Sequence, residues 1–157
     1  MQRLAKDIHE LVQNAEQMGK EEYLRRAVQL QYRFIRIHPF AADSNGRTSR
    51  ALLNMMTIPK GILVELPKEK KPEFISASNA TNKKMDEQGY FEALNGNSEE
   101  LDVIEAANAD LPIYDFIMQN CILEVEPPQS NYQTRPKQQV IQTEKVTDLP
   151  ESEEQEQ

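Results

Sequence analysis

One charged loop, "HPFAADSNGRTSR" from His38 to Arg50, carries the residues of this sequence best suited to chemistry. A chain that enters a helix at "SNGR" offers free backbone N–H groups, and the helix dipole favours an anion there. Gly46 allows the close approach of a ligand because it lacks a Cβ. Arg47 and Arg50 are three residues apart and can face one side of the new helix, where two guanidinium groups suit phosphate oxygens. The pattern predicts a phosphate site.

Three further residues of the loop suggest what such a site can do. Asp43 would repel phosphates unless a cation lay between them, and Mg²⁺ is commonly held by one carboxylate together with substrate phosphates. Asn45 can donate a side-chain hydrogen bond, and His38 is a base that can take a proton from a hydroxyl. The residues together predict a site for ATP or a similar triphosphate and Mg²⁺. The alternative interpretation is a loop between two helices with solvated charges and a helix cap.

Helical periodicity on both sides of the loop predicts the elements that position it. Apolar spacing predicts helices over residues 4–15, over 21–37, and from the loop to Pro59, with Met55 and Met56 in the core. Pro39 ends the second helix because proline disfavours the α conformation at the preceding residue. Later helices are expected from Pro72, over "YFEAL", from Ser98, and from Pro112 through Ile122, with "ILVELP" as an extended connection. We therefore expect an all-α fold, a compact helical bundle with the loop between two core helices.

Composition divides the chain and limits its partners. Residues 126–157 are rich in Gln, Glu and Pro, which predicts a disordered acidic tail after a helical domain over residues 1–125. The net charge of -8 argues against binding to nucleic acid or to an anionic membrane. The single cysteine, Cys121, lies in an apolar stretch and is expected to be a buried thiol in a reducing compartment. Neither a signal peptide nor an apolar run of about 20 residues is evident, so we expect a cytoplasmic protein.

The stretch "IHPFAADSNGRTSRALLNMM" resembles the signature of the Fic-domain family, whose motif runs His-x-Phe-x-Asp/Glu-Gly-Asn-Gly-Arg-x-x-Arg. The preceding "AVQLQYRFIRIHPF" and the later "ISASNATNKKMDEQGYFEAL" resemble core helices of the same family, so the resemblance covers most of residues 1–125. It implies a mostly helical protein that transfers the AMP part of ATP to a Ser, Thr or Tyr hydroxyl of a target protein.

The same resemblance implies a role for each residue of the motif. His38 would be the base that deprotonates the target, Phe40 the buried anchor of the loop, and Asp43 the Mg²⁺ ligand. The anion nest would consist of Ser44, Asn45 and Gly46. The β-phosphate would be contacted by Arg47 and the γ-phosphate by Arg50.

The sequence departs from the family pattern in three ways. Five steps separate His38 from Asp43 where the family has four, because "FAAD" holds an additional alanine, Ala41 or Ala42. The residues before the motif predict two helices, without the β-hairpin that aligns the target in relatives. No segment matches the inhibitory pattern Ser/Thr-x-x-x-Glu-Gly/Asn, so inhibition would come from a partner chain or from sequence outside this one.

These departures leave three functions open. The first is an adenylyltransferase, in which a bulge at Ala41 and Ala42 absorbs the additional residue and leaves the rest of the motif in place. Gly46 favours this function, because relatives that phosphorylate their targets tend to have lysine at that position. The second reading is such a relative, transferring a phosphate or another phosphate-containing group. The third is a catalytically impaired module that binds nucleotide or a partner without efficient transfer, since a misplacement of about 1 Å can cost about 100-fold in rate.

Overall fold

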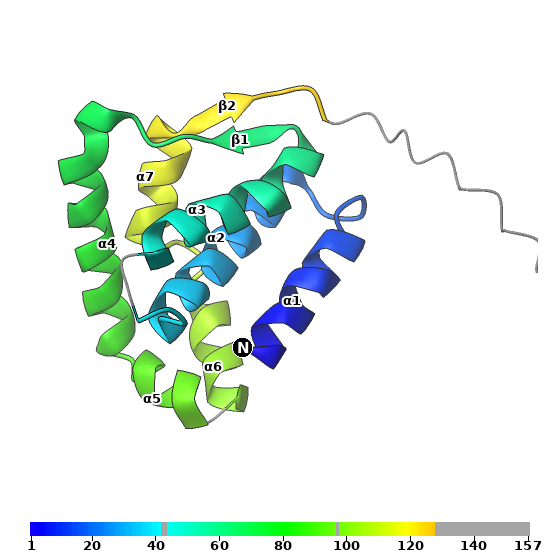
Figure 1. The fold of residues 1–157 in the computed structure, drawn as a ribbon. Coiled ribbons are helices and arrows are strands. Elements are labelled where there is room, and N and C mark those ends of the chain that lie inside the picture. Colours follow the sequence, from blue (N-terminus) through cyan, green and yellow to red (C-terminus); the bar gives the residue numbers. More distant parts are fainter. Residues whose placement is uncertain (42–43, 97, 128–157) are drawn as a thin grey trace, which may run out of the picture.

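The computed structural model describes residues 1–41, 44–96 and 98–127. Helices dominate this part of the chain, and a single pair of short strands accompanies them (Figure 1). The elements in chain order are α1 (Gln2–Gln13), α2 (Lys20–Ile37), α3 (Ser44–Thr57), η1 (Ile58–Lys60), β1 (Ile62–Val64), η2 (Lys68–Lys70), α4 (Lys71–Asp86), α5 (Tyr90–Gly96), α6 (Ser98–Ala107), α7 (Pro112–Asn120) and β2 (Ile122–Glu124). The predicted all-α fold is confirmed, with this small sheet as an addition.

Helix α2 lies in the middle of the bundle. Figure 1 places α1 on one side of α2 and α3 across it, and the chain passes from α2 to α3 through the charged loop. Every residue from Leu30 to Phe34 is buried, so this part of α2 has no face directed to solvent. A helix that is buried on all sides belongs to the centre of a core. The loop therefore begins at the end of the most enclosed helix of the fold.

The strands β1 and β2 pair antiparallel, with Leu63 opposite Leu123. Asn54 of α3 joins this sheet to the bundle: its carboxamide accepts a hydrogen bond from the Val64 N–H at 2.8 Å and donates one to the Val64 carbonyl at 3.0 Å. The extended conformation predicted for "ILVELP" is confirmed over Ile62–Val64. The helix predicted through Ile122 is wrong at its end, because α7 stops at Asn120 and Ile122 pairs with β1 instead.

Two predictions about buried side chains have opposite outcomes. Cys121 is 3% exposed, as expected for a core thiol, and burial raises the pKa of this thiol. Met56 is buried, but Met55 is 72% exposed, so its predicted place in the core is wrong. The two methionines are adjacent on α3 and point about 100° apart, which leaves only one of them on the side that packs against α2.

Residues 128–157, which hold nearly all of the predicted acidic tail, lie outside the described residues. Among the described helices, none combines the length and apolar character that crossing a lipid bilayer requires.

Candidate functional site

His38 occupies the end of α2 in a left-handed backbone conformation, with φ 51° and ψ 59°. Its N–H donates to the carbonyls of Phe34 at 3.3 Å and Ile35 at 3.2 Å, which closes the last turn of the helix. Pro39 follows directly, and a proline disfavours the right-handed α region at the residue before it. The helix therefore ends at His38, and the imidazole is exposed at the start of the loop.

Asn45 connects the start of the loop to the first turn of α3. Its side-chain Oδ1 accepts a hydrogen bond from the Phe40 N–H at 3.1 Å, and its Nδ2 donates to the Phe40 carbonyl at 2.7 Å. These two backbone contacts fix the orientation of the carboxamide, since a donor and an acceptor face opposite partners. The same Nδ2 lies 3.3 Å from Nδ1 and 3.2 Å from Nε2 of His38. Asn45, which is only 5% exposed, thus holds the imidazole against the loop.

The first turns of α3 present an open cationic surface. Ser44 is half-buried, whereas Gly46 and Arg47 are exposed. Among the described residues, a Cβ added at Gly46 would meet only the Nη1 of Arg50, at 3.9 Å, so packing against them does not require glycine. Gly46 lies in the first turn of α3, at a helix N-terminus, where backbone N–H groups and the helix dipole favour an anion.

Arg47 and Arg50 differ from the other arginines that the structure describes. Neither forms an ion pair with a described residue, and both are exposed. Each of the others has a carboxylate partner: Arg3, Arg25, Arg26, Arg33 and Arg36. The positive charge of the described residues is therefore uncompensated at the start of α3, where a phosphate site was predicted.

Phe40 departs from its expected role as a buried anchor. Its ring packs on Phe34 with centroids 6.3 Å apart, but its exposed fraction is 44%. The expectation of burial is wrong, because the contacts that hold the loop are polar and pass from the Phe40 backbone to Asn45. The ring covers the end of α2 from outside the core.

Asp43, the predicted metal ligand, lies outside the described residues. Within the described ranges no group of three His, Cys, Asp or Glu side chains is close enough together to hold a metal ion. A Mg²⁺ ion that takes most of its ligands from phosphate and water needs only one carboxylate, so the residues of the loop fit that kind of site.

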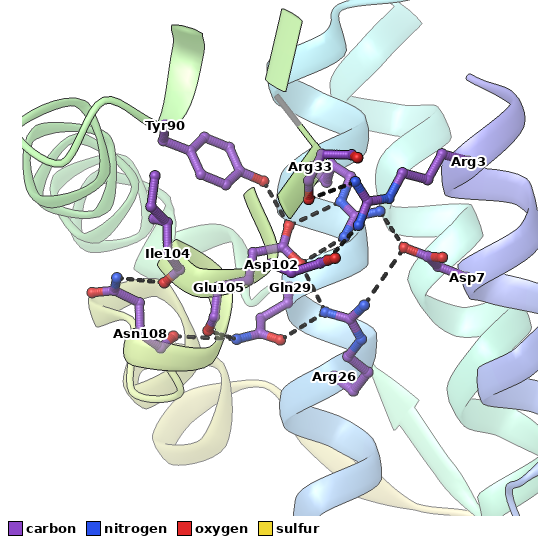
Figure 2. A network of polar contacts seen from close by, with 11 residues as sticks. Arg3, Asp7, Arg26, Gln29, Arg33, Tyr90, Asp102, Ile104, Glu105 and Asn108 are labelled. Atoms are coloured by element: carbon purple, nitrogen blue, oxygen red, sulfur yellow. Dashed lines mark hydrogen bonds and ion pairs between the residues drawn. The ribbon is translucent and has the colours of Figure 1, made fainter. Parts of the chain in front are cut away.

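A buried ionic network holds α2 to three other helices (Figure 2). Arg33, whose side chain is 2% exposed, binds Glu105 of α6 in two places, through Nε at 2.9 Å and Nη2 at 2.6 Å. Its Nη1 donates to Asp7 of α1 at 2.5 Å. Arg26 donates to Glu105 at 2.8 Å, and the Tyr90 hydroxyl of α5 donates to Glu105 at 3.0 Å.

The network keeps Glu105 charged although its side chain is only 4% exposed. Burial alone would raise the pKa of Glu105, but the hydrogen bonds and charges of Arg33 and Arg26 lower it further than burial raises it, so the pKa is below its ordinary value. Burial, followed by the charge of Glu105, raises the pKa of Tyr90. Because Arg33 lies five residues before His38 on the same helix, this network fixes the position of the helix end that carries the imidazole.

A family model described as the Fic/DOC family matches residues 1–57. Over these residues the chain is similar to the Fic/DOC family. The match covers α1, α2, the loop and α3, and therefore the whole segment from His38 to Arg50. No curated protein and no solved structure gives a significant match. Fic/DOC proteins commonly transfer AMP or another group, so this similarity supports a transferase-type enzyme in general terms.

The fold brings together most of the residues singled out in the sequence. His38, Asn45 and the exposed positions Gly46 and Arg47 surround one end of α3, and Arg50 follows one turn later. Sequence reasoning missed the network around Arg33, whose partners come from positions 26 and 72 residues away. It also missed the contact of Asn45 with the Phe40 backbone, for which an Asx side chain at the start of a helix was the only available signal.

Proposed function

We propose that this protein is an adenylyltransferase that moves AMP from ATP to a Ser, Thr or Tyr hydroxyl of a target protein. The observation that carries the proposal is the position of the exposed His38 imidazole, held by Asn45 beside a helix start whose arginines make no ion pair with described residues. A base and a phosphate-binding surface thus lie on one loop, as this transfer requires.

In the proposed complex the triphosphate of ATP binds at the N-terminus of α3. Backbone N–H groups of Ser44, Asn45 and Gly46 face the phosphates, since the first turn of a helix leaves its N–H groups without intrahelical partners. Arg47 and Arg50 neutralise the β- and γ-phosphates, and their freedom from other carboxylates among the described residues supports this role. With respect to the described residues, the bare backbone at Gly46 leaves room for the phosphate oxygens.

The proposed reaction is an in-line displacement at the α-phosphorus. The target hydroxyl oxygen forms a bond to this phosphorus while its proton passes to a nitrogen of His38, and the bond from the α-phosphorus to the bridging oxygen breaks. The electron pair of that bond leaves with pyrophosphate. Asn45 supports the base role through position: its Nδ2 lies 3.3 Å from Nδ1 and 3.2 Å from Nε2 of His38 and holds the exposed imidazole at the loop.

Asp43 is the residue of this site that would hold Mg²⁺, together with phosphate oxygens and water. When bound, the ion would neutralise charge on the phosphates. In the sequence Asp43 follows His38 by five positions.

Transfer of label into cell lysate tests the proposal. ATP labelled at the α-phosphorus and ATP labelled at the γ-phosphorus are compared in the presence of Mg²⁺, with His38→Ala as the inactive variant. The exposed His9 of α1 supplies a matched control, His9→Ala. We expect labelling from the α position alone, lowered at least about 100-fold by His38→Ala and unchanged by His9→Ala.

Two other results would replace this function. Labelling from the γ position alone would mean that the protein phosphorylates its target. Absence of label from both positions, with ATP still bound, would mean a nucleotide-binding module without efficient transfer.

A further inference from the structure

A cavity of about 370 Å³ lies beside α3, between this helix and the segment that runs from β1 to the start of α4. We call it the basic cavity, after the Arg50, Lys68 and Lys71 side chains that line it. Asn54 and Val64, which join α3 to β1, form part of its wall. Arg50 belongs both to this cavity and to the family motif, so the cavity adjoins the proposed ATP site.

The charge of the basic cavity is unbalanced. Its lining includes three cationic side chains and one carboxylate, Glu65, which is exposed. None of the three cations forms an ion pair with a residue that the structure describes. The neighbouring Lys70 does form one, with Glu73 at 3.1 Å. In a chain of net charge -8, this concentration of unpaired cations marks a local site for an anion.

The start of α4 adds to the positive potential. Lys71 is the first residue of this 16-residue helix, and no side chain caps its N-terminus. The Lys71 N–H donates to the Lys68 carbonyl and Pro72 has no N–H, so the contribution of this helix start is its dipole rather than free N–H groups. Glu73, the acidic residue in the first turn of α4, is already paired with Lys70. The helix dipole thus acts together with the side chains of Lys68 and Lys71.

Arg50 connects the cavity to the phosphate site at the end of α3. It follows Gly46 by one turn, a rise of about 6 Å along the helix. Its Nη1 lies 3.9 Å from the position of a Cβ at Gly46, so the guanidinium extends back toward the helix start. A triphosphate whose α-phosphate lies near His38 and whose chain follows α3 would bring its terminal phosphates to this guanidinium and to the mouth of the basic cavity.

From this arrangement we infer that Lys68 and Lys71, together with Arg50, bind the β,γ-diphosphate portion of the nucleotide, the part that leaves as pyrophosphate. The inference rests on the proposed function and extends its substrate site to η2 and α4. As the bond to the α-phosphorus breaks, its electron pair passes to the β-phosphate, and negative charge grows there. Cations already placed around that charge favour the transition state and select a triphosphate over a monophosphate.

Binding measured without any target protein tests the inference. Lys68→Ala/Lys71→Ala is compared by calorimetry with Lys6→Ala/Lys83→Ala, which removes the same charge from exposed lysines outside the cavity. The ligands are ATP, AMP and inorganic pyrophosphate, each with Mg²⁺. We expect the cavity variant to bind ATP and pyrophosphate about tenfold more weakly, with AMP affinity unchanged. Lys68→Arg/Lys71→Arg should retain the affinity, since it keeps both charges.

Three results would overturn the inference. The first is unchanged affinity of the cavity variant for ATP and pyrophosphate. The second is an equal loss for ATP and AMP, which would place the lysines away from the terminal phosphates. The third is unchanged nucleotide affinity with loss of target labelling, which would make the basic cavity a docking surface for an acidic segment of the target. A failure of the proposed function has a different result. In that case the unmodified protein transfers no label, while its binding of pyrophosphate still depends on Lys68 and Lys71.

Discussion

The side chain of Asn45 pairs with the backbone of Phe40 as a neighbouring strand would. Its Oδ1 accepts a hydrogen bond from the Phe40 N–H at 3.1 Å, and its Nδ2 donates one to the Phe40 carbonyl at 2.7 Å. The amide nitrogen simultaneously lies within 3.3 Å of both ring nitrogens of His38. One buried carboxamide thereby sets the distance between the end of α2 and the start of α3 and also the position of the imidazole. The loop depends on this residue more than on any apolar anchor.

Replacement of Asn45 by alanine should release the loop. We expect Asn45→Ala to lower kcat for label transfer by at least about tenfold and to destabilise the protein by about 1 kcal/mol, because the part-buried N–H and carbonyl of Phe40 lose their partner. Asn45→Asp keeps the acceptor for this N–H but not the donor, so it should recover stability better than activity. Kinetics and urea unfolding of the two variants provide the measurement. Full activity in Asn45→Ala would show that the Asn45 side chain does not position His38.

The left-handed backbone conformation of His38 should affect the stability of variants at this position. This conformation costs about 1 kcal/mol of folding free energy for a residue with a Cβ, whereas glycine adopts it without that cost. His38→Gly should therefore be more stable than His38→Ala by about 1 kcal/mol, although both variants lack the base. Thermal unfolding of the two proteins measures the difference. Equal stabilities would indicate that residue 38 leaves the φ of 51° when its side chain is removed.

Deletion of Ala42 tests the additional residue of the motif. Asn45 already joins the two ends of the segment to which Ala42 belongs, and its hydrogen bonds to Phe40 are satisfied at the present length. Removing a residue shortens the contour by up to about 3.5 Å and should break that contact. We expect label transfer to fall by about 100-fold or more. A rise in activity would mean instead that the additional alanine displaces the base in the natural sequence.

Loss of charge at Glu105 should destabilise the whole bundle. Glu105→Gln leaves the buried Arg33 with Asp7 as its one remaining carboxylate partner among the described residues, which we expect to cost about 3 kcal/mol at pH 7. Glu→Gln at the exposed Glu10 is the matched control, with a cost below about 1 kcal/mol. Urea unfolding at constant pH measures both.

The cost of Glu105→Gln should also depend on pH. The pKa of Glu105 is lower in the folded protein than in the unfolded chain, so the unfolded chain binds more protons in the acid range. The stabilisation is complete above the ordinary glutamate pKa, about 4.3, and is lost as the pH falls through the lower folded value. The difference in free energy of unfolding between the natural protein and Glu105→Gln should therefore decrease below about pH 4. A constant difference from pH 7 to pH 3 would contradict a lowered pKa of Glu105 in the folded protein.

The helices on both sides of the loop were predictable because periodic apolar residues, Pro39 and Pro59 mark them in the local sequence. The second strand was not, since Ile122 continues the apolar run of α7 and only its distant pairing with Val64 makes it extended. Local pattern also placed Met55 in the core, although its neighbour Met56 occupies that position.

For the site, the motif located the residues and the fold showed how several of them are held. Exposure of Phe40 and burial of Asn45 reverse what their polarity suggests, because the loop is held through its backbone. Arg33 looked like an ordinary helical arginine, and its two carboxylate partners are far away in sequence. Contacts of that kind cannot be derived from periodicity.

The arrangement of Arg33 also has a consequence for how the chain acquires its structure during synthesis. Its guanidinium can leave water only when Asp7 and Glu105 are both in place, and Glu105 emerges from the ribosome long after α2. Strand β1 likewise waits for residues 122–124. We therefore expect the contacts around Arg33, within residues 1–57, to be completed only after α6 has been made. A nascent chain that stops before α6 should contain every residue of the site without an ordered place for His38.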